Sequence, residues 1–217
     1  EFKGQRSELL EYLSSKDTMF KLSSYVLLKR GDNGSMGDIA CIAYGNLVAY
    51  KSFDREKIQK EIREKNLEKV LELDWGYEIE ELRCSGNYEF LVGWTKKTSI
   101  SKDMINLVKS SITQDFLKKV EKIVQNLKLA MKNGNKMEIK RNILGNGNEL
   151  KKLKEEIYSE ELVDLVEATE NLDVCAKSSG SGGGDCGVAI SFSKKDSEIL
   201  VERWKSVGIE LLYKSEL

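Results

Sequence analysis

The chain has 217 residues, of which 40% are hydrophobic, enough for one large core or two smaller ones. Its 35 lysines and arginines balance 36 aspartates and glutamates, so charge gives no argument for nucleic acid or an anionic membrane. No apolar run approaches a membrane span in length and no secretory signal stands at the start, so we expect no nucleic acid and no membrane as partner.

The sequence contains no histidine, which disfavours histidine-based triads and most catalytic zinc sites. Four cysteines, at positions 41, 84, 175 and 186, form no Cys-x-x-Cys pair. We therefore expect no metal-ligating residues and reduced, mostly buried thiols in a cytoplasmic protein. Cys186 as a nucleophile is disfavoured because no histidine base is present.

Apolar periodicity predicts the following elements in chain order. Helices are expected over residues 7–29, 38–44, 54–64 (with Asp54 as N-cap), 101–111, 114–132, 136–156 (irregular at 145–147), 159–171 and 195–207. Strands are expected over residues 47–50, 77–82, 88–92, 172–176, 188–192 and 210–213. This order predicts an α+β fold, with helices covering one face of a largely antiparallel sheet and a domain boundary near residues 83–88.

Residues 177–187 read Lys-Ser-Ser-Gly-Ser-Gly-Gly-Gly-Asp-Cys-Gly. Such a backbone can aim its N–H groups into one concavity that attracts phosphate oxygens, and glycine lets a ligand approach closely. A flexible Ser/Gly linker is the alternative, which the apolar strands expected on both sides disfavour. The run is no Walker A loop, since no Gly-Lys-Ser/Thr ends it, and no Rossmann turn, since a strand follows.

A second candidate segment is residues 33–40, Asn-Gly-Ser-Met-Gly-Asp-Ile-Ala. Two glycines in four residues indicate an exposed loop, and Asp38 stands where a helix is expected to begin. Taken alone, the segment favours an ordinary role for Asp38 as a helix N-cap, worth about 1 kcal/mol.

Together, the two segments resemble motifs of the phosphomevalonate kinases, which belong to the GHMP kinase superfamily. Residues 177–187 are similar to the family's C-terminal glycine motif, and residues 33–40 to its segment with the catalytic aspartate. Residues 44–54 and 91–95 resemble two further family segments, in family order. Two departures stand out: Lys-Lys-Thr-Ser-Ile-Ser at 96–101 replaces a stretch that commonly has a proline and a Ser-Thr pair, and residues 1–30 match no Gly-Leu-Gly-Ser-Ser-type ATP loop.

The resemblance implies a GHMP-kinase-like α+β fold. In it, residues 1–85 are the remainder of an N-terminal domain whose start is missing. Residues 86–217 are a C-terminal domain, a ferredoxin-like α/β sandwich with extra helices. The resemblance further implies transfer of the ATP γ-phosphoryl group, with Mg²⁺, to (R)-5-phosphomevalonate in the mevalonate pathway. Without the ATP loop we expect this chain alone to be inactive. The alternatives are another GHMP kinase, such as a mevalonate kinase, and a non-catalytic phosphate-binding relative.

The resemblance also assigns site residues. Asp38 would be the catalytic residue, orienting a cationic group or Mg²⁺ rather than acting as an obligatory base. Backbone N–H groups around Ser179, Gly180 and Ser181 would bind the acceptor phosphate, with Gly182, Gly183 and Gly184 completing the phosphate loop. Ser52 and Thr95 are further expected substrate contacts, although Ser52 fits an ordinary strand-end hydroxyl equally well. We expect Gly182→Val to lower turnover far more than stability.

Overall fold

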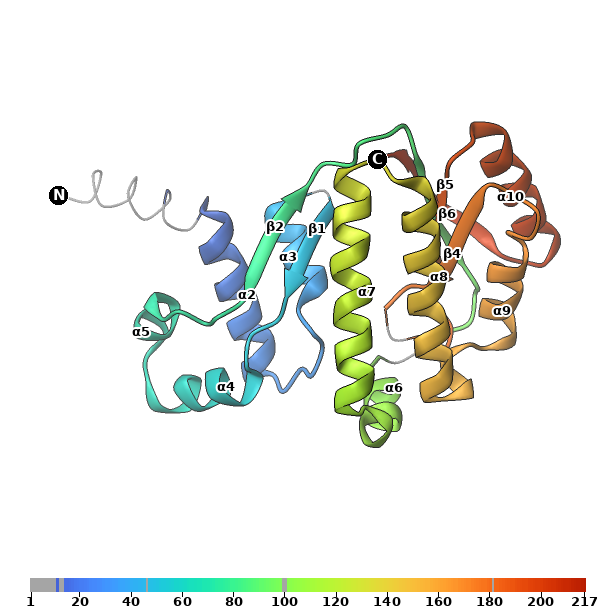
Figure 1. Ribbon diagram of the computed structural model, residues 1–217. Helices are drawn as coiled ribbons and strands as arrows, with labels where there is room; N and C mark the ends of the chain where they lie inside the picture. The colour runs from blue at the N-terminus through green and yellow to red at the C-terminus, as the bar shows by residue number, and fades with distance from the viewer. Residues whose placement is uncertain (1–10, 12–13, 46, 99–100, 181) are drawn as a thin grey trace. The chain divides into compact units, whose positions relative to one another are not determined.

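The computed structural model of the chain divides into two compact units, residues 1–82 and 83–217 (Figure 1). The structure describes residue 11 and residues 14–45, 47–98, 101–180 and 182–217, without the side chains of 101–103 and 105. Each unit has its own hydrophobic core. None of the helices in the described part of the chain combines the length and apolar character that a membrane crossing requires.

The first unit combines four helices with a two-stranded antiparallel sheet among its described residues. Its elements are α2 (Lys16–Lys29), α3 (Gly37–Tyr44), β1 (Leu47–Lys51), α4 (Arg55–Glu64), α5 (Leu67–Glu72) and β2 (Glu78–Leu82). In the sheet, Tyr50 of β1 lies opposite Ile79 of β2. Helix α5 was not predicted, because its six residues are too short for a periodic pattern.

Side-chain caps set the helix starts in this unit. Asp54 is the N-cap of α4, as predicted, and its carboxylate accepts the Lys57 N–H at 3.0 Å. The single helix predicted over 7–29 is interrupted at Ser15: residues 11 and 14 are helical, and α2 begins at Lys16, because the N-cap Ser15 is extended and accepts the Thr18 N–H. Residues 1–10 and 12–13 of that prediction lie outside the described residues.

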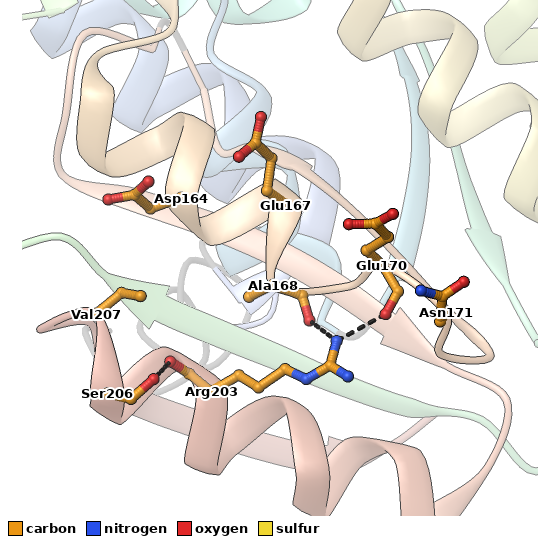
Figure 2. A pocket seen from close by; sticks show the side chains of 8 residues that line it. All are labelled: Asp164, Glu167, Ala168, Glu170, Asn171, Arg203, Ser206 and Val207. Atoms are coloured by element: carbon orange, nitrogen blue, oxygen red, sulfur yellow. Dashed lines mark hydrogen bonds between the residues drawn. The ribbon is translucent and has the colours of Figure 1, made fainter.

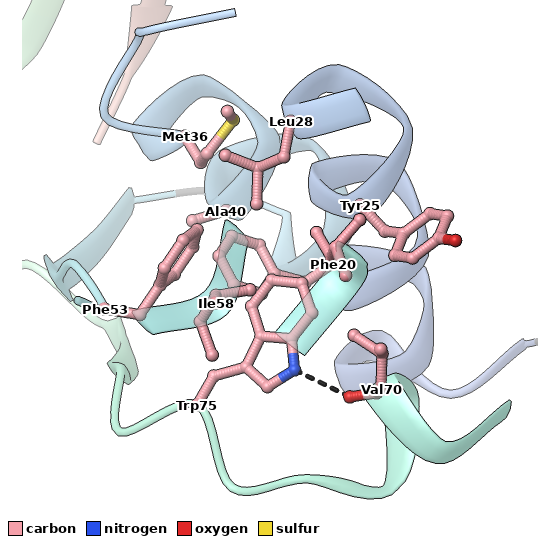
Figure 3. Packing of buried hydrophobic residues seen from close by; sticks show 10 residues of the cluster. Phe20, Tyr25, Leu28, Met36, Ala40, Phe53, Ile58, Val70 and Trp75 are labelled. Atoms are coloured by element: carbon pink, nitrogen blue, oxygen red, sulfur yellow. Dashed lines mark hydrogen bonds between the residues drawn. The ribbon is translucent and has the colours of Figure 1, made fainter. Parts of the chain in front are cut away.

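An aromatic cluster forms the centre of the first core (Figure 3). The Phe20 ring is fully buried and makes edge-to-face contacts with Tyr50, Tyr77 and Phe53, with centroids 5.7, 4.6 and 6.4 Å away. Such pairs add about 0.5–1.5 kcal/mol each beyond their burial. This packing fixes the ring of Tyr50, whose hydroxyl contacts the loop before α3.

The second unit contains a four-stranded sheet with helices around it. Its elements are β3 (Glu89–Trp94), α6 (Ser101–Val108), the 3₁₀ turn η1 (Lys109–Ser111), α7 (Gln114–Lys132), α8 (Lys136–Leu153), the 3₁₀ turn η2 (Glu155–Ile157), α9 (Glu160–Glu167), β4 (Val174–Ser178), β5 (Cys186–Ser191), α10 (Lys194–Ser206) and β6 (Glu210–Glu216). The strand order is β4-β5-β3-β6, and every pairing is antiparallel. This is the β-α-β-β-α-β ferredoxin-like arrangement, which confirms the predicted fold class.

Helices α9 and α10 cover one face of this sheet. Leu162 and Leu165 of α9 are fully buried, as is Trp204 of α10, whose indole N–H donates to the Leu165 carbonyl at 3.0 Å. Helices α7 and α8 run side by side, and α8 packs against the edge strand β4 (Figure 1). The sheet therefore has helical neighbours on more than the one face expected.

The predicted irregularity in α8 is wrong, because the helix continues through residues 145–147. Packing explains the glycine at 147: a Cβ there would lie 2.8 Å from the Tyr158 hydroxyl oxygen. Packing also explains the glycine at 93 in β3, since a Cβ there would lie 2.9 Å from Cζ3 of Trp204. Both glycines serve close packing rather than chain flexibility.

Candidate functional site

The loop before α3 is held in place by backbone contacts in the first unit. Asp32 Oδ1 accepts the Gly34 N–H at 2.7 Å, which forms an Asx turn. The Arg55 guanidinium donates to the Asp32 carbonyl at 2.7 Å and also to the Gly34 carbonyl. Met36, the N-cap of α3, is buried with a left-handed backbone (φ 66°). The path into Asp38 is thus fixed by residues that the sequence did not single out.

Tyr50 links this loop to the end of β1. Its hydroxyl donates to the Ser35 carbonyl at 2.8 Å and lies 3.2 Å from Ser52 Oγ. Burial raises the pKa of the Tyr50 hydroxyl, which keeps it protonated as a donor. Ser52 is exposed, and its own hydroxyl lies 3.4 Å from the Ser35 carbonyl oxygen. The structure therefore brings Ser52 next to the loop that precedes Asp38.

Asp38 lies in the first turn of α3 and is exposed. It is not the N-cap, since that position belongs to Met36, so the alternative of an ordinary capping aspartate is wrong. Among the described residues its carboxylate has no hydrogen bond or ion pair. The positive end of the helix dipole favours a carboxylate here, and the group remains available to a cation.

The glycine loop (residues 179–185) connects β4 to β5 and is anchored by its own backbone. The N–H groups of Ser179, Gly183 and Asp185 donate to the carbonyls of Cys186 (2.9 Å), Ile157 (2.8 Å) and Lys97 (2.6 Å). These three donors are therefore occupied within the chain, and the phosphate contact expected around Ser179 stays a prediction. Gly180 has no such bond and is exposed, whereas Ser181 lies outside the described residues.

Thr95 and Lys97 hold the far end of this loop. The Thr95 hydroxyl donates to the Asp185 carbonyl at 2.9 Å and accepts the Lys97 N–H at 3.3 Å. Thr95 is buried, so in the structure its hydroxyl supports the loop; its expected contact with substrate stays a prediction. Lys96 and Asp185 both have left-handed backbones (φ 61° and 52°), an unfavourable conformation that is typical of functional segments.

The glycines in and after the loop differ in the space around their Cβ positions. A Cβ on Gly182 would lie 2.4 Å from the Ile157 carbonyl oxygen, and one on Gly184 would lie 2.5 Å from the Lys97 carbonyl oxygen. A Cβ on Gly187, after the loop, would lie 2.5 Å from Leu165 Cδ2. Gly180, by contrast, faces open space, with nothing within 4 Å of its Cβ position. Gly182→Val is therefore expected to disturb packing as well as turnover, which replaces the earlier expectation.

Lys177 and Ser178 end β4 directly before the loop. The Lys177 ammonium donates to the Ser178 carbonyl at 2.6 Å, and burial lowers its pKa to about 8. The Ser178 hydroxyl is fully buried without a hydrogen-bond partner, and its N–H donates to the Tyr158 hydroxyl at 3.4 Å. Polar groups of the described chain are thus left unsatisfied where the glycine loop begins.

A surface cavity of about 400 Å³ lies elsewhere in this unit, between α9 and α10 (Figure 2). Its lining includes the carboxylates of Asp164, Glu167 and Glu170, and the Arg203 guanidinium donates to the carbonyls of Ala168 and Glu170 at 3.0 and 2.6 Å. Carboxylates repel a phosphate group, so this cavity does not fit the expected substrates.

The cysteines supply no reactive thiol near the loop. All four are free, but only Cys175 is buried and Cys41 is exposed, so the expectation of mostly buried thiols is wrong. Burial raises the pKa of Cys186, with a further rise from Asp185, which opposes a thiolate there. The described residues contain no group of three or more Cys, Asp or Glu side chains arranged to hold a metal ion.

Comparison with known proteins gives three kinds of match. Residues 125–210 match the family described as GHMP kinases C terminal. A phosphomevalonate kinase from Streptomyces sp. (strain CL190) is 26% identical over 90% of this chain and 56% of its own length. The structure of Streptococcus pneumoniae phosphomevalonate kinase in complex with phosphomevalonate and AMPPNP is 44% identical, with a TM-score of 0.90, over 93% of this chain and 61% of that one.

A more distant structure, L. major mevalonate kinase in complex with R-mevalonate, is 17% identical with a TM-score of 0.68, and it shares the fold. The chain spans between 56% and 61% of the length of the phosphomevalonate kinases above. The resemblance seen in the sequence motifs is confirmed. Residues 125–210 thus match the GHMP kinase C-terminal family, and the chain is similar, over nearly its whole length, to phosphomevalonate kinases.

Proposed function

We propose that this chain belongs to an ATP-dependent kinase that transfers a phosphoryl group to the phosphate of 5-phosphomevalonate. The observation that carries the proposal is the glycine loop, which is rigidly anchored at Ser179, Gly183 and Asp185 while Gly180 stays open. An anchored loop with one open glycine fits a ligand that approaches the backbone closely. The similarity to an S. pneumoniae enzyme in complex with phosphomevalonate and AMPPNP supports the same substrates here.

The chemistry suits a chain without histidine. The acceptor is a phosphate monoester whose second pKa is about 6, so at neutral pH it is mainly a dianion that needs no strong base. Phosphoryl transfer depends chiefly on positioning and charge stabilisation. The Gly180 N–H and the Ser179 hydroxyl would bind the acceptor phosphate, with Ser181, Gly182, Gly183 and Gly184 forming the rest of the loop.

Asp38 would orient a cation of the reaction. Mg²⁺ usually binds one or two carboxylates together with substrate phosphates, so the exposed carboxylate of Asp38 fits this role without a preformed ligand cluster. Held there, Mg²⁺ would supply positive charge that stabilises the transferring phosphoryl group. Ser52 would contribute a hydroxyl beside the loop that precedes Asp38. Arg55 and Tyr50, which hydrogen-bond to the backbone of that loop, would act as positioning residues.

We further infer that residues 1–85 belong to the N-terminal domain of a GHMP kinase and residues 86–217 to its C-terminal domain. The division of the chain after Leu82 and the family match over residues 125–210 support this assignment. We place the reaction in the cytoplasm, where four free thiols remain reduced.

The test is a substrate panel with the protein expressed from its complete gene. ADP release is measured with ATP, Mg²⁺ and either phosphomevalonate or mevalonate. We expect turnover with phosphomevalonate and little with mevalonate, because only the former carries the phosphate that the loop would hold. Turnover with mevalonate alone would indicate a mevalonate kinase, and no turnover with either would contradict the kinase assignment.

A further inference from the structure

Lys177 has an unusual position for a lysine. It is the fourth residue of the five-residue strand β4, two residues before Ser179 in the glycine loop. Its side chain is partly buried, and among the described residues its hydrogen-bond partner is the Ser178 carbonyl oxygen, 2.6 Å from Nζ. An ammonium group has three donors, so two of them have no acceptor among the described residues.

Several other lysines around this sheet are neutralised. Each of three pairs with a carboxylate: Lys97 with Glu161 at 3.2 Å, Lys140 with Asp173 at 3.5 Å, and Lys214 with Glu89 at 3.1 Å. Lys177 has no carboxylate partner in the described part of the chain. Burying an ammonium without a counter-charge is unfavourable, and the lowered pKa of about 8 agrees with that.

The surroundings of Lys177 are polar on the side of the loop. Tyr158 places its hydroxyl oxygen 3.4 Å from the Ser178 N. A Cβ on Gly147 of α8 would lie 3.6 Å from Lys177 Cβ, so α8 closes over the stem of the side chain. The loop itself opens at Gly180, three residues further along. The Lys177 ammonium, which lacks a counter-ion among the described residues, therefore lies where the loop begins. A bound anion would neutralise its charge there.

We propose that Lys177 is the cationic contact of the acceptor's phosphate group at the glycine loop. The inference rests on the proposed function, because it uses the phosphate that the loop would bind. A phosphate dianion would accept the two remaining ammonium N–H groups, and such charge-assisted bonds are stronger than neutral ones. The phosphates of a nucleotide have the same chemistry, so acceptor and nucleotide must be separated by experiment.

The test measures binding by calorimetry with the protein expressed from its complete gene. Phosphomevalonate and AMPPNP are titrated separately into wild type, Lys177→Met and Lys140→Met. Lys140 is the matched control, because its ammonium also donates to a backbone carbonyl beside β4, that of Leu172. When Lys140 is replaced, Asp173 still pairs with Lys136. We expect Lys177→Met to weaken phosphomevalonate binding at least about tenfold, with AMPPNP binding and the control unchanged.

Three measurements distinguish a structural role for Lys177 from a role in binding. Lys177→Met should melt no lower than wild type, since it removes an unpaired buried charge, and Lys177→Arg should retain more affinity than Lys177→Met. In wild type, the pKa of Lys177 followed by ¹³C NMR should rise from about 8 when phosphomevalonate is added. A pKa that does not move at saturation contradicts the proposal.

The two proposals fail differently. The assignment of Lys177 is overturned if Lys177→Met binds phosphomevalonate as tightly as wild type, or if it loses affinity for AMPPNP alone. In either case, normal turnover by the wild type still supports the kinase function. Lysine-dependent binding of phosphomevalonate without any phosphoryl transfer overturns the kinase function and leaves the role of Lys177 standing.

Discussion

Replacement of Gly180 by alanine separates the function of the loop from its stability. Gly180 has φ 66° and open space at its Cβ position, so the only structural cost is the left-handed backbone. That cost is about 1–2 kcal/mol, partly offset by about 0.4–1 kcal/mol from the less flexible unfolded chain. Gly208, after α10, has φ 84° and equally open space, which makes Gly208→Ala a matched control outside the loop.

Gly182→Ala should behave differently from both. It has the same backbone cost (φ 77°), and its Cβ would also lie 2.4 Å from the Ile157 carbonyl oxygen. Ile157 would have to move, which breaks the 2.8 Å bond from the Gly183 N–H. An unmade bond of this kind costs about 1–3 kcal/mol, so we expect a total loss of about 2–4 kcal/mol, against about 1 kcal/mol for Gly180→Ala and Gly208→Ala.

The assay combines urea unfolding, followed by tryptophan fluorescence, with steady-state kinetics on phosphomevalonate. Gly180→Ala should lower kcat/KM at least about tenfold, because a methyl group stands where the acceptor phosphate would approach and one charged hydrogen bond is worth about 1.5–3 kcal/mol. Gly208→Ala should leave kcat/KM unchanged. Equal kinetics for these two variants, or equal stability of Gly180→Ala and Gly182→Ala, would refute the reasoning.

Three further predictions follow from the site. Asp38→Asn should lower kcat by about ten- to a hundredfold with an unchanged melting temperature, since the carboxylate has no protein partner among the described residues; a change in melting temperature alone would exclude the role in catalysis. Thr95→Val should lose about 0.5–1.5 kcal/mol of stability in urea, because the Asp185 carbonyl loses the 2.9 Å bond from the hydroxyl and keeps the 2.8 Å bond from the Thr95 N–H. The exposed Thr98→Val should show no such loss. Because the pKa of Lys177 is about 8 and about 10.4 in an unfolded chain, the unfolded state binds more protons between these values. The free energy of unfolding should therefore rise by up to about 3 kcal/mol between pH 8 and 10.4, a rise that Lys177→Met should not show.

Periodicity predicted the long elements well and the special residues poorly. Helix α7 has the predicted bounds, Gln114–Lys132, because its apolar stripe is long and Thr113 caps it. The glycines at 145 and 147 predicted a break that is absent, and Gly147 instead allows the close approach of Tyr158 to α8. Sequence alone cannot distinguish a glycine required by a neighbour from one required by a turn.

The same difficulty limited prediction of the site. The glycine run was found from composition. Only the structure shows that carbonyl oxygens leave no room for a Cβ at Gly182 and Gly184, whereas the Cβ position of Gly180 faces open space. Arg55 falls within the helix predicted over residues 54–64, but its contacts with the Asp32 and Gly34 carbonyls span more than twenty residues of chain. Contacts of that separation leave no periodic signal.

The central claim, that the glycine loop binds the acceptor's phosphate, is tested most directly by the amide signal of Gly180. Protein expressed from its complete gene is labelled with ¹⁵N and titrated with phosphomevalonate and, separately, with mevalonate. We predict a large downfield shift of the Gly180 N–H signal with phosphomevalonate only, while the Gly208 amide signal stays in place. A Gly180 signal that does not move when phosphomevalonate is saturating would contradict it.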